Sequence, residues 1–171
     1  ILVIVIALLS ARFLPSVPGE KLTKANSPLA VLKIPGVLLV LLLTFLSVTA
    51  HYGAYTYITL LVEKIAFPGG INLALLIFGI GSVISVLGSA KVIDNYLREV
   101  IVSMLLLGAV SMGLFLWFGD TYGLTHLAFF LWGIAFGPLV TMYQTAVSKQ
   151  VSHGKAVATS TQSAVFNFSI M

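Results

Sequence analysis

Residues 44–59 carry a row of polar side chains at helical spacing. Five members, three or four residues apart, share one helix face: Thr44, Ser47, His51, Tyr55 and Thr59. The imidazole of His51 changes charge close to neutral pH, so it can exchange a proton or hydrogen-bond a polar solute. This face is the first candidate for a polar path. The alternative for His51 is a neutral ring that hydrogen-bonds a neighbouring helix.

The polar row lies inside a chain that is otherwise very apolar. Of the 171 residues, 59% are hydrophobic and 8% are charged, whereas a soluble domain carries about 25% charged residues. About 20 apolar residues are needed to cross a bilayer as a helix, and four uncharged runs are long enough: 34–62, 65–90, 100–119 and 121–148. We predict an all-α integral membrane protein with helices at about 35–62, 70–91, 99–118, 123–148 and 156–171.

Two shorter apolar runs lie at the chain ends. Residues 1–11 and 156–171 are too short to cross a bilayer alone, and no helix-ending residue closes the second run. We therefore expect a segment of a larger membrane protein. The polar stretch 15–34 contains prolines and glycine and is expected to connect two parts of that protein.

Basic residues alternate between the predicted connections. The first connection holds four Lys or Arg residues, the second one, the third two, the fourth none and the fifth two. Cytoplasmic loops retain an excess of Lys and Arg. We predict that the first, third and fifth connections are cytoplasmic and that the second and fourth face outward.

Small residues mark the second complete span. Gly81, Ser85 and Ser89 recur every four residues, and small residues at this spacing let helix backbones approach closely in lipid. We expect this face to pack against another helix.

A kink is predicted in the run 121–148. Gly133, Gly137 and Pro138 lie in its middle, and a proline cannot donate a hydrogen bond to the carbonyl four residues back. Gln144 extends a polar face beyond the kink, and Asn167 lies in the unusually polar last run.

Several classes of protein are disfavoured. The chain has no His-Glu-x-x-His, no Gly-x-Ser-x-Gly, no phosphate loop and no paired intramembrane carboxylates, so we predict neither an enzyme nor a cofactor or metal site. The nine Lys and Arg residues are scattered singly, which disfavours nucleic acid as a partner. A channel is disfavoured because filter-like loops and rings of charge are missing.

The order of three motifs resembles the second half of a major facilitator superfamily transporter. The run TAHYGAYTYI at 49–58 is similar to the seventh helix of bacterial sugar-efflux and drug–proton antiport members. DNYLR at 94–98 resembles the short loop motif between the eighth and ninth helices. WGIAFG at 132–137, QTA at 144–146 and Phe166-Asn167 resemble the tenth and eleventh helices. The likeness is greatest to arabinose and sugar efflux transporters, with purine nucleoside and chloramphenicol exporters as near relatives.

The resemblance implies an arrangement of parts. Residues 1–14 would end the sixth helix, 15–34 would be the cytoplasmic linker between halves, and 35–171 would be a partial C-terminal bundle, from the seventh helix to the start of the eleventh. The expected partners are the lipid bilayer, a small-molecule substrate and the N-terminal half of the same transporter. The expected location is a bacterial inner membrane, crossed several times.

The resemblance also implies roles for single residues. Sugars or similar small polar molecules would leave by alternating access, driven by a proton gradient, past a wall that includes His51, Tyr55, Gln144 and Asn167. Asp94 and Arg98 would form a cytoplasmic latch; their alternative is a solvated loop that only sets topology.

Two other functions stay open on the sequence alone. One is export of drugs such as chloramphenicol or of purine nucleosides. The other is a membrane receptor or scaffold that keeps the fold without transporting.

Overall fold

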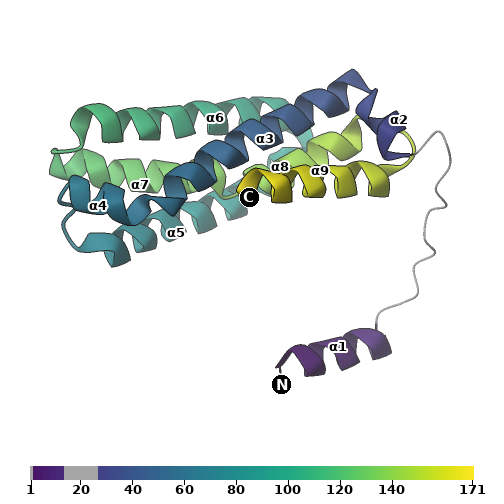
Figure 1. Cartoon of the computed structure of the whole chain (residues 1–171), viewed down its shortest axis with the longest axis horizontal. Coiled ribbons are helices and arrows are strands. Elements are labelled where there is room, and N and C mark those ends of the chain that lie inside the picture. Colours follow the sequence, from purple (N-terminus) through teal and green to yellow (C-terminus); the bar gives the residue numbers. More distant parts are fainter. Residues whose placement is uncertain (1, 14–26) are drawn as a thin grey trace.

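Helices dominate the part of the chain that the computed structural model describes, residues 2–13 and 27–171 (Figure 1). Four spans are long and apolar enough to cross a membrane: Pro35–Thr56, Gly70–Ser89, Ile93–Phe118 and Tyr122–Lys149. No strand occurs in the described residues, and the prediction of an all-α membrane protein is confirmed. The helices, in chain order, are α1 (Leu2–Phe13), α2 (Pro28–Leu32), α3 (Pro35–Thr56), α4 (Ile58–Lys64), α5 (Gly70–Ser89), α6 (Ile93–Phe118), α7 (Tyr122–Phe136), α8 (Leu139–Lys149) and α9 (Lys155–Ile170).

The linker predicted at 15–34 lies outside the described residues as far as residue 26. Its last part forms the short helix α2, which starts because Pro28 suits the first helical position and the Ser27 side chain accepts a hydrogen bond from the Ala30 N–H. Pro35 likewise occupies the first turn of α3, but its N-cap residue, Ile34, makes no side-chain capping bond.

The predicted helix 35–62 is divided at Tyr57. This residue has φ −100° and ψ 17°, and it separates α3 from α4. One residue earlier, the Thr56 hydroxyl donates to the Tyr52 carbonyl at 2.7 Å. Such a bond can bend a helix, but Thr44 makes the same bond without a break, and neither glycine nor proline marks this position.

The run 121–148 is interrupted where its proline stands. Helix α7 ends at Phe136 and α8 begins at Leu139, with Gly137 and Pro138 between them. The two pieces belong to different packing clusters. Buried Phe129 and Trp132 of α7 pack with side chains of α4, α5 and α6, whereas Tyr143 and Val147 of α8 pack with α2, α3 and α9.

Helix α6 starts earlier than the predicted residue 99, at Ile93, and its first turns are not regular. Tyr96 has φ −127° and ψ 34°. The short first segment therefore leaves the axis of the long apolar segment that follows.

Backbone contact joins α5 to α7. A methyl group placed on Gly81 would meet the Phe130 carbonyl oxygen, and one on Gly133 would meet the Phe78 carbonyl oxygen. A methyl group on Gly137 would lie 2.8 Å from the Ser82 carbonyl oxygen. The two backbones can touch because these three positions have no side chain.

Serine hydroxyls tie neighbouring helices to α7. Ser85 of α5 donates to the Ile134 carbonyl at 2.7 Å, and Ser111 of α6 donates to the Ala128 carbonyl at 2.8 Å. Ser89 is also buried but donates within its own helix, to Val86 at 3.0 Å. Gly81 and Ser85 thus contact α7, while Ser89 lies beyond the hydrogen-bonded part of this interface.

Most other hydroxyls in the bundle bond to the turn before them. Thr44 donates to the Val40 carbonyl at 2.9 Å, and Thr161 donates to the Val157 carbonyl at 2.8 Å. Such bonds satisfy a polar group where no water is present.

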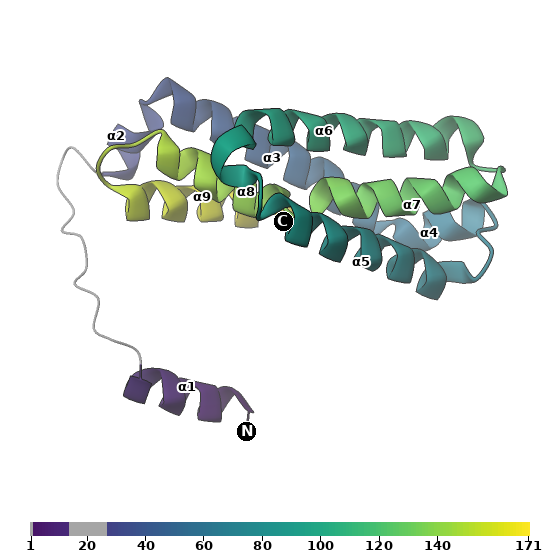
Figure 2. The ribbon, with the colours of Figure 1, turned by 180° about the vertical axis from the view of Figure 1, so that it is seen from behind.

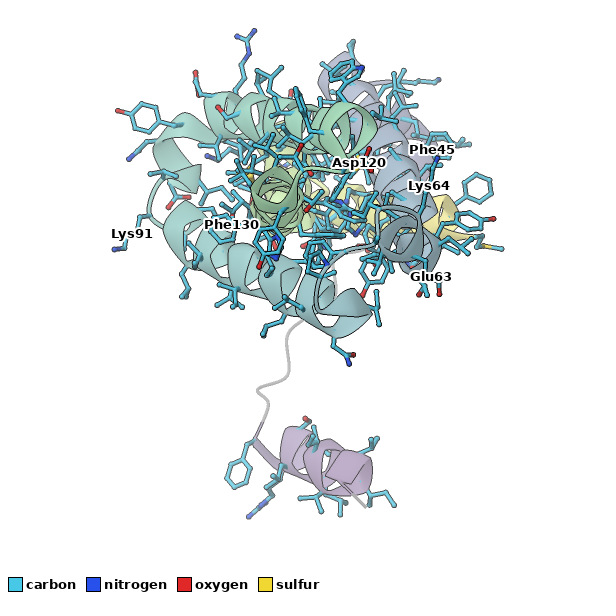
Figure 3. The ribbon with its side chains drawn as sticks, turned by 90° about the vertical axis from the view of Figure 1, so that its left-hand side faces the viewer. Phe45, Glu63, Lys64, Lys91, Asp120 and Phe130 are labelled. Carbon is cyan, nitrogen blue, oxygen red and sulfur yellow. The ribbon has the colours of Figure 1, made fainter. Side chains whose placement is uncertain are left out.

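The loops that join α4 to α5, α6 to α7 and α8 to α9 lie at the ends of the bundle, whereas the connection from α5 to α6 lies part-way along it (Figures 1 and 2). Connections 65–69 and 119–121, both predicted to face outward, lie at the same end, and there Figure 3 shows Glu63, Lys64 and Asp120. The connection 150–154 lies at the other end, beside α2.

Large apolar side chains cover the outside of the bundle. Leu87 is 67% exposed and Leu116 is 79% exposed, and Phe45 projects from the rim in Figure 3. These surfaces face lipid in a membrane protein. Trp117 and Tyr122 are also exposed and flank the connection 119–121, a position typical of interfacial aromatic residues.

A methyl group at Gly133 should destabilise the bundle. We expect Gly133→Ala to lower the free energy of unfolding by about 1–3 kcal/mol because the α5 backbone must move away. Gly79→Ala is the matched control, since nothing lies within 4 Å of an added methyl group there. Thermal denaturation of both variants in nanodiscs measures the effect; equal melting temperatures would contradict the close contact.

The predicted orientation can be tested with single cysteines because the chain has none. In a cysteine-free background, Asp120→Cys should react with a membrane-impermeant maleimide on intact cells, and His153→Cys only after permeabilisation. The reverse pattern would invert the orientation.

Candidate functional site

His51 lies at the junction of the two packing clusters. It is buried on α3, 8% exposed, in contact with side chains of α5 and α7. Its ring is stacked face to face on Phe136, with centroids 3.2 Å apart and planes 3° apart. Phe136 is the last residue of α7, immediately before the interruption at Gly137 and Pro138. The imidazole is thus held against the end of a broken helix.

Trp132 fixes the edge of the imidazole. Its indole Nε1–H donates a hydrogen bond to His51 Nδ1 at 3.0 Å. Trp132 is 2% exposed and packs against Phe115 and Phe129 in the cluster of α4, α5, α6 and α7. An indole nitrogen can only donate, so Nδ1 of His51 is the acceptor and carries no proton in this arrangement.

Further aromatic rings surround His51. Tyr55 is 5.7 Å away on α3 and Phe78 is 6.0 Å away on α5, both within 27° of the plane of the imidazole. Tyr52 presents its edge to His51 at 5.2 Å. We call His51, Tyr52, Tyr55, Phe78, Trp132 and Phe136 the aromatic cluster. Near-parallel rings of this kind suit contact with another flat ring.

A cavity of about 220 Å³ lies beside the aromatic cluster, between α3, α6 and α7. His51, Trp132 and Phe136 form part of its wall, together with Ser47 from one turn earlier in α3. Met104 and Met112 of α6 face them across the cavity. The wall is mostly apolar, with its polar atoms on the α3 side.

A second polar contact joins α3 to α8. The hydroxyls of Ser47 and Tyr143 are 3.1 Å apart and form a hydrogen bond, and Ser47 also donates to the Leu43 carbonyl at 2.6 Å. Tyr143 is fully buried. This pair couples the polar row of α3 to the helix segment that follows the interruption.

The structure brings together only two of the four predicted pathway residues. His51 and Tyr55 are stacked neighbours. Gln144 on α8 and Asn167 on α9 are exposed, and neither hydrogen-bonds His51 or Tyr55 in the described part of the chain. Asn167 instead donates to the Ser163 carbonyl at 2.9 Å, one turn back.

Asp94 and Arg98 are exposed and form no ion pair with any residue that the structure describes. Tyr96, between them, interrupts the helical geometry that would place positions four apart on one face. The contact made here is different: the Lys149 ammonium donates to the backbone carbonyl of Asp94 at 3.0 Å. It joins the start of α6 to the end of α8.

Three important residues were not predicted as site residues from the sequence. In the sequence, Trp132 and Phe136 stand out only as parts of the WGIAFG motif, and nothing marks Tyr143. One signal was available: the chain has two tryptophans, and Trp132 lies in mid-span, away from the interfaces where tryptophan is enriched. A buried indole N–H needs an acceptor, and His51 was the obvious polar candidate.

Gln162 of α9 is fully buried, and both polar atoms of its amide lack a hydrogen-bond partner in the described residues. No group of three or more His, Cys, Asp or Glu residues in those residues could hold a metal ion.

Comparison with known proteins places this architecture in a family. The sequence model described as the Major Facilitator Superfamily matches residues 1–171. The chain belongs to this superfamily.

Curated members of the superfamily extend the comparison. The purine ribonucleoside efflux pump NepI of Escherichia coli (strain K12) is 29% identical over 157 residues, which cover 90% of this chain and 39% of that protein. The pump of the same name from Shigella flexneri has the same identity and coverage, and that from Salmonella paratyphi C is 28% identical over the same length. The chain thus spans about two fifths of these relatives. No solved structure matches it significantly.

Membership of the superfamily indicates the general class of protein to which the bundle belongs. Its apolar spans are those of a multi-pass membrane protein, and its curated relatives are efflux pumps.

The contact between Ser47 and Tyr143 is expected to contribute to folding. A double-mutant cycle with Ser47→Ala and Tyr143→Phe should give a coupling free energy of about 0.6 kcal/mol, the average for such bonds between membrane helices. Ser103→Ala is the control because its hydroxyl bonds only the Glu99 carbonyl. Chemical denaturation in mixed micelles measures all four proteins, and zero coupling would remove this link between α3 and α8.

Proposed function

We propose that this chain is part of a secondary transporter that exports purine nucleosides by alternating access. The aromatic cluster around His51 carries the proposal: several of its rings lie near-parallel at the junction of the two packing clusters. A purine base is flat and stacks well on aromatic side chains, each stacked base contributing about 1–3 kcal/mol in other binding sites. The names of the curated relatives support the same substrate class.

Sugars are the second substrate class, favoured by the resemblance to arabinose efflux transporters. A monosaccharide needs several hydrogen bonds at one place, but the described side chains beside His51 are mostly aromatic or apolar. A nucleoside contains both a flat base and a ribose. It therefore uses the aromatic cluster more fully than arabinose or chloramphenicol would.

The remaining parts of the mechanism are proposed with it. The N-terminal half of the transporter supplies the opposite wall, and a proton gradient across a bacterial inner membrane drives export. Gln144 and Asn167 are exposed toward the space outside this bundle and line the path where that half packs. Asp94 and Arg98, both without ion-pair partners in the described residues, act as a latch in another access state.

Transport by the full-length protein in proteoliposomes tests the proposal. With an imposed pH difference, we expect labelled adenosine to move against the proton flow and a protonophore to stop it. Arabinose and chloramphenicol should move much more slowly. His51→Ala should reduce nucleoside transport about tenfold or more because it removes the centre of the stack, whereas His153→Ala, on an exposed connection, should not.

Two outcomes would change the conclusion. Faster movement of arabinose than adenosine would replace nucleosides by sugars as the substrate. No movement of any of the three compounds by folded protein would overturn transport of these classes and favour the receptor or scaffold function.

A further inference from the structure

The position of His51 in the aromatic cluster is compatible with two different roles. It could carry the proton that drives transport, or it could hold the substrate. The two roles need different things from the ring. A proton carrier must accept a proton on a free nitrogen, whereas a substrate donor must keep an N–H directed at the substrate.

Trp132 decides which nitrogen is available. Its N–H occupies Nδ1 of His51 at 3.0 Å, so a neutral ring with this bond carries its proton on Nε2. A proton on Nδ1 would place an imidazole N–H opposite the indole N–H, with no acceptor between these two donors. The geometry therefore selects one tautomer and makes Nε2–H the free donor.

The Nε2 atom of His51 makes no hydrogen bond within the described residues, and His51 lines the cavity. In the described part of the chain, the only buried side-chain nitrogen or oxygen atoms without a hydrogen-bond partner belong to Gln162. His51 makes one hydrogen bond there, through Nδ1. Nε2 has no partner there and is not among those fully buried atoms, and His51 lines the cavity beside the aromatic cluster. A donor held rigidly by stacking on Phe136 is thus left unused.

We infer that His51 is a hydrogen-bond donor to the base of a purine nucleoside and that Trp132 is the residue that positions it. The inference rests on the proposed function. The donor lies in the plane of a ring that is nearly parallel to Tyr55, Phe78 and Phe136. The ring nitrogens of a purine accept hydrogen bonds in the plane of the base, so a base lying edge to edge with His51 meets the donor correctly. The proton that drives transport is carried by another group.

The tautomer is measured directly by NMR. Full-length protein labelled with ¹⁵N-histidine in nanodiscs should show His51 with a proton on Nε2 and an unprotonated, hydrogen-bonded Nδ1. The His51→Gln variant identifies the signal by its loss. Trp132→Phe keeps an aromatic ring but removes the N–H, and it should convert the signal to a mixture of tautomers. A His51 ring that carries its proton on Nδ1, or on both nitrogens at neutral pH, would overturn the inference.

Substrate analogues test the contact with the base. Adenosine is compared with its 1-deaza, 3-deaza and 7-deaza analogues, each of which lacks one ring-nitrogen acceptor. In the wild type, the analogue that lacks the nitrogen bonded by His51 should have a KM about two- to tenfold higher than that of adenosine, the effect of one hydrogen bond. In His51→Phe, which keeps stacking but has no donor, that difference between adenosine and the analogue should vanish. A difference that persists in His51→Phe would overturn the inference.

Conservative variants separate the donor from a proton carrier. Glutamine offers an amide N–H near the position of Nε2 but does not exchange a proton near neutral pH. His51→Gln lacks the stacked ring, so adenosine transport should slow, but the number of protons moved per adenosine should stay that of the wild type. Trp132→Phe should raise KM with little change in maximum rate because the donor is present but less well placed. Loss of proton coupling in His51→Gln with adenosine binding intact would make His51 the proton carrier.

The experiments distinguish failure of the proposed function from failure of the role of His51. If the wild type neither binds nor moves adenosine, the proposed function and the role of His51 toward nucleosides fall together. If the wild type transports adenosine but the deaza difference survives in His51→Phe, only the role of His51 falls.

Discussion

Trp132 and Phe136 reach His51 because the backbones of α5 and α7 touch beside them. The contact needs glycine at 81 and 133, where any side chain would meet a carbonyl oxygen of the partner helix. Lipid provides no hydrophobic drive for two apolar helices to associate, so close packing and hydrogen bonds must hold them. The Ser85 and Ser111 hydroxyls add those bonds to α7 from two sides. With α7 fixed in this way, the positions of its indole and its last phenylalanine are also fixed.

The interruption at Gly137 and Pro138 divides that transmembrane segment into two helices that pack in different clusters. Helix α7 belongs with α5 and α6, whereas α8 belongs with α3 and α9. His51 is on α3 but bonds to α7, so the bond between Trp132 and His51 crosses from one packing cluster to the other. A solute that contacts His51 therefore touches the place where the two clusters meet.

Local chemistry explains which features could be predicted from the sequence. The membrane class, the apolar spans and the interruption near Pro138 depend on residues close in the chain, and each follows from composition or from the missing N–H of proline. The break at Tyr57 follows a threonine whose hydroxyl makes a bond that also occurs in unbroken helices, so the sequence does not mark it. The family resemblance implied that Asp94 and Arg98 act together, and a regular helix would place them on one face, but the dihedral angles of Tyr96 make the helix irregular. The partner of His51 could not be chosen from several polar or aromatic residues without the packing of α3 against α7.

The hydroxyl groups that bond to their own helix affect how the chain enters a membrane during synthesis. Thr44 satisfies its hydrogen bond within one turn, so α3 needs no neighbour to satisfy this hydroxyl in lipid. The four long apolar spans can partition into the bilayer singly, in chain order, and meet their partners later. The Gln162 amide is the exception in the described bundle, because it is buried and finds no such bond. Helix α9 is therefore the segment whose insertion depends most on the helices already inserted.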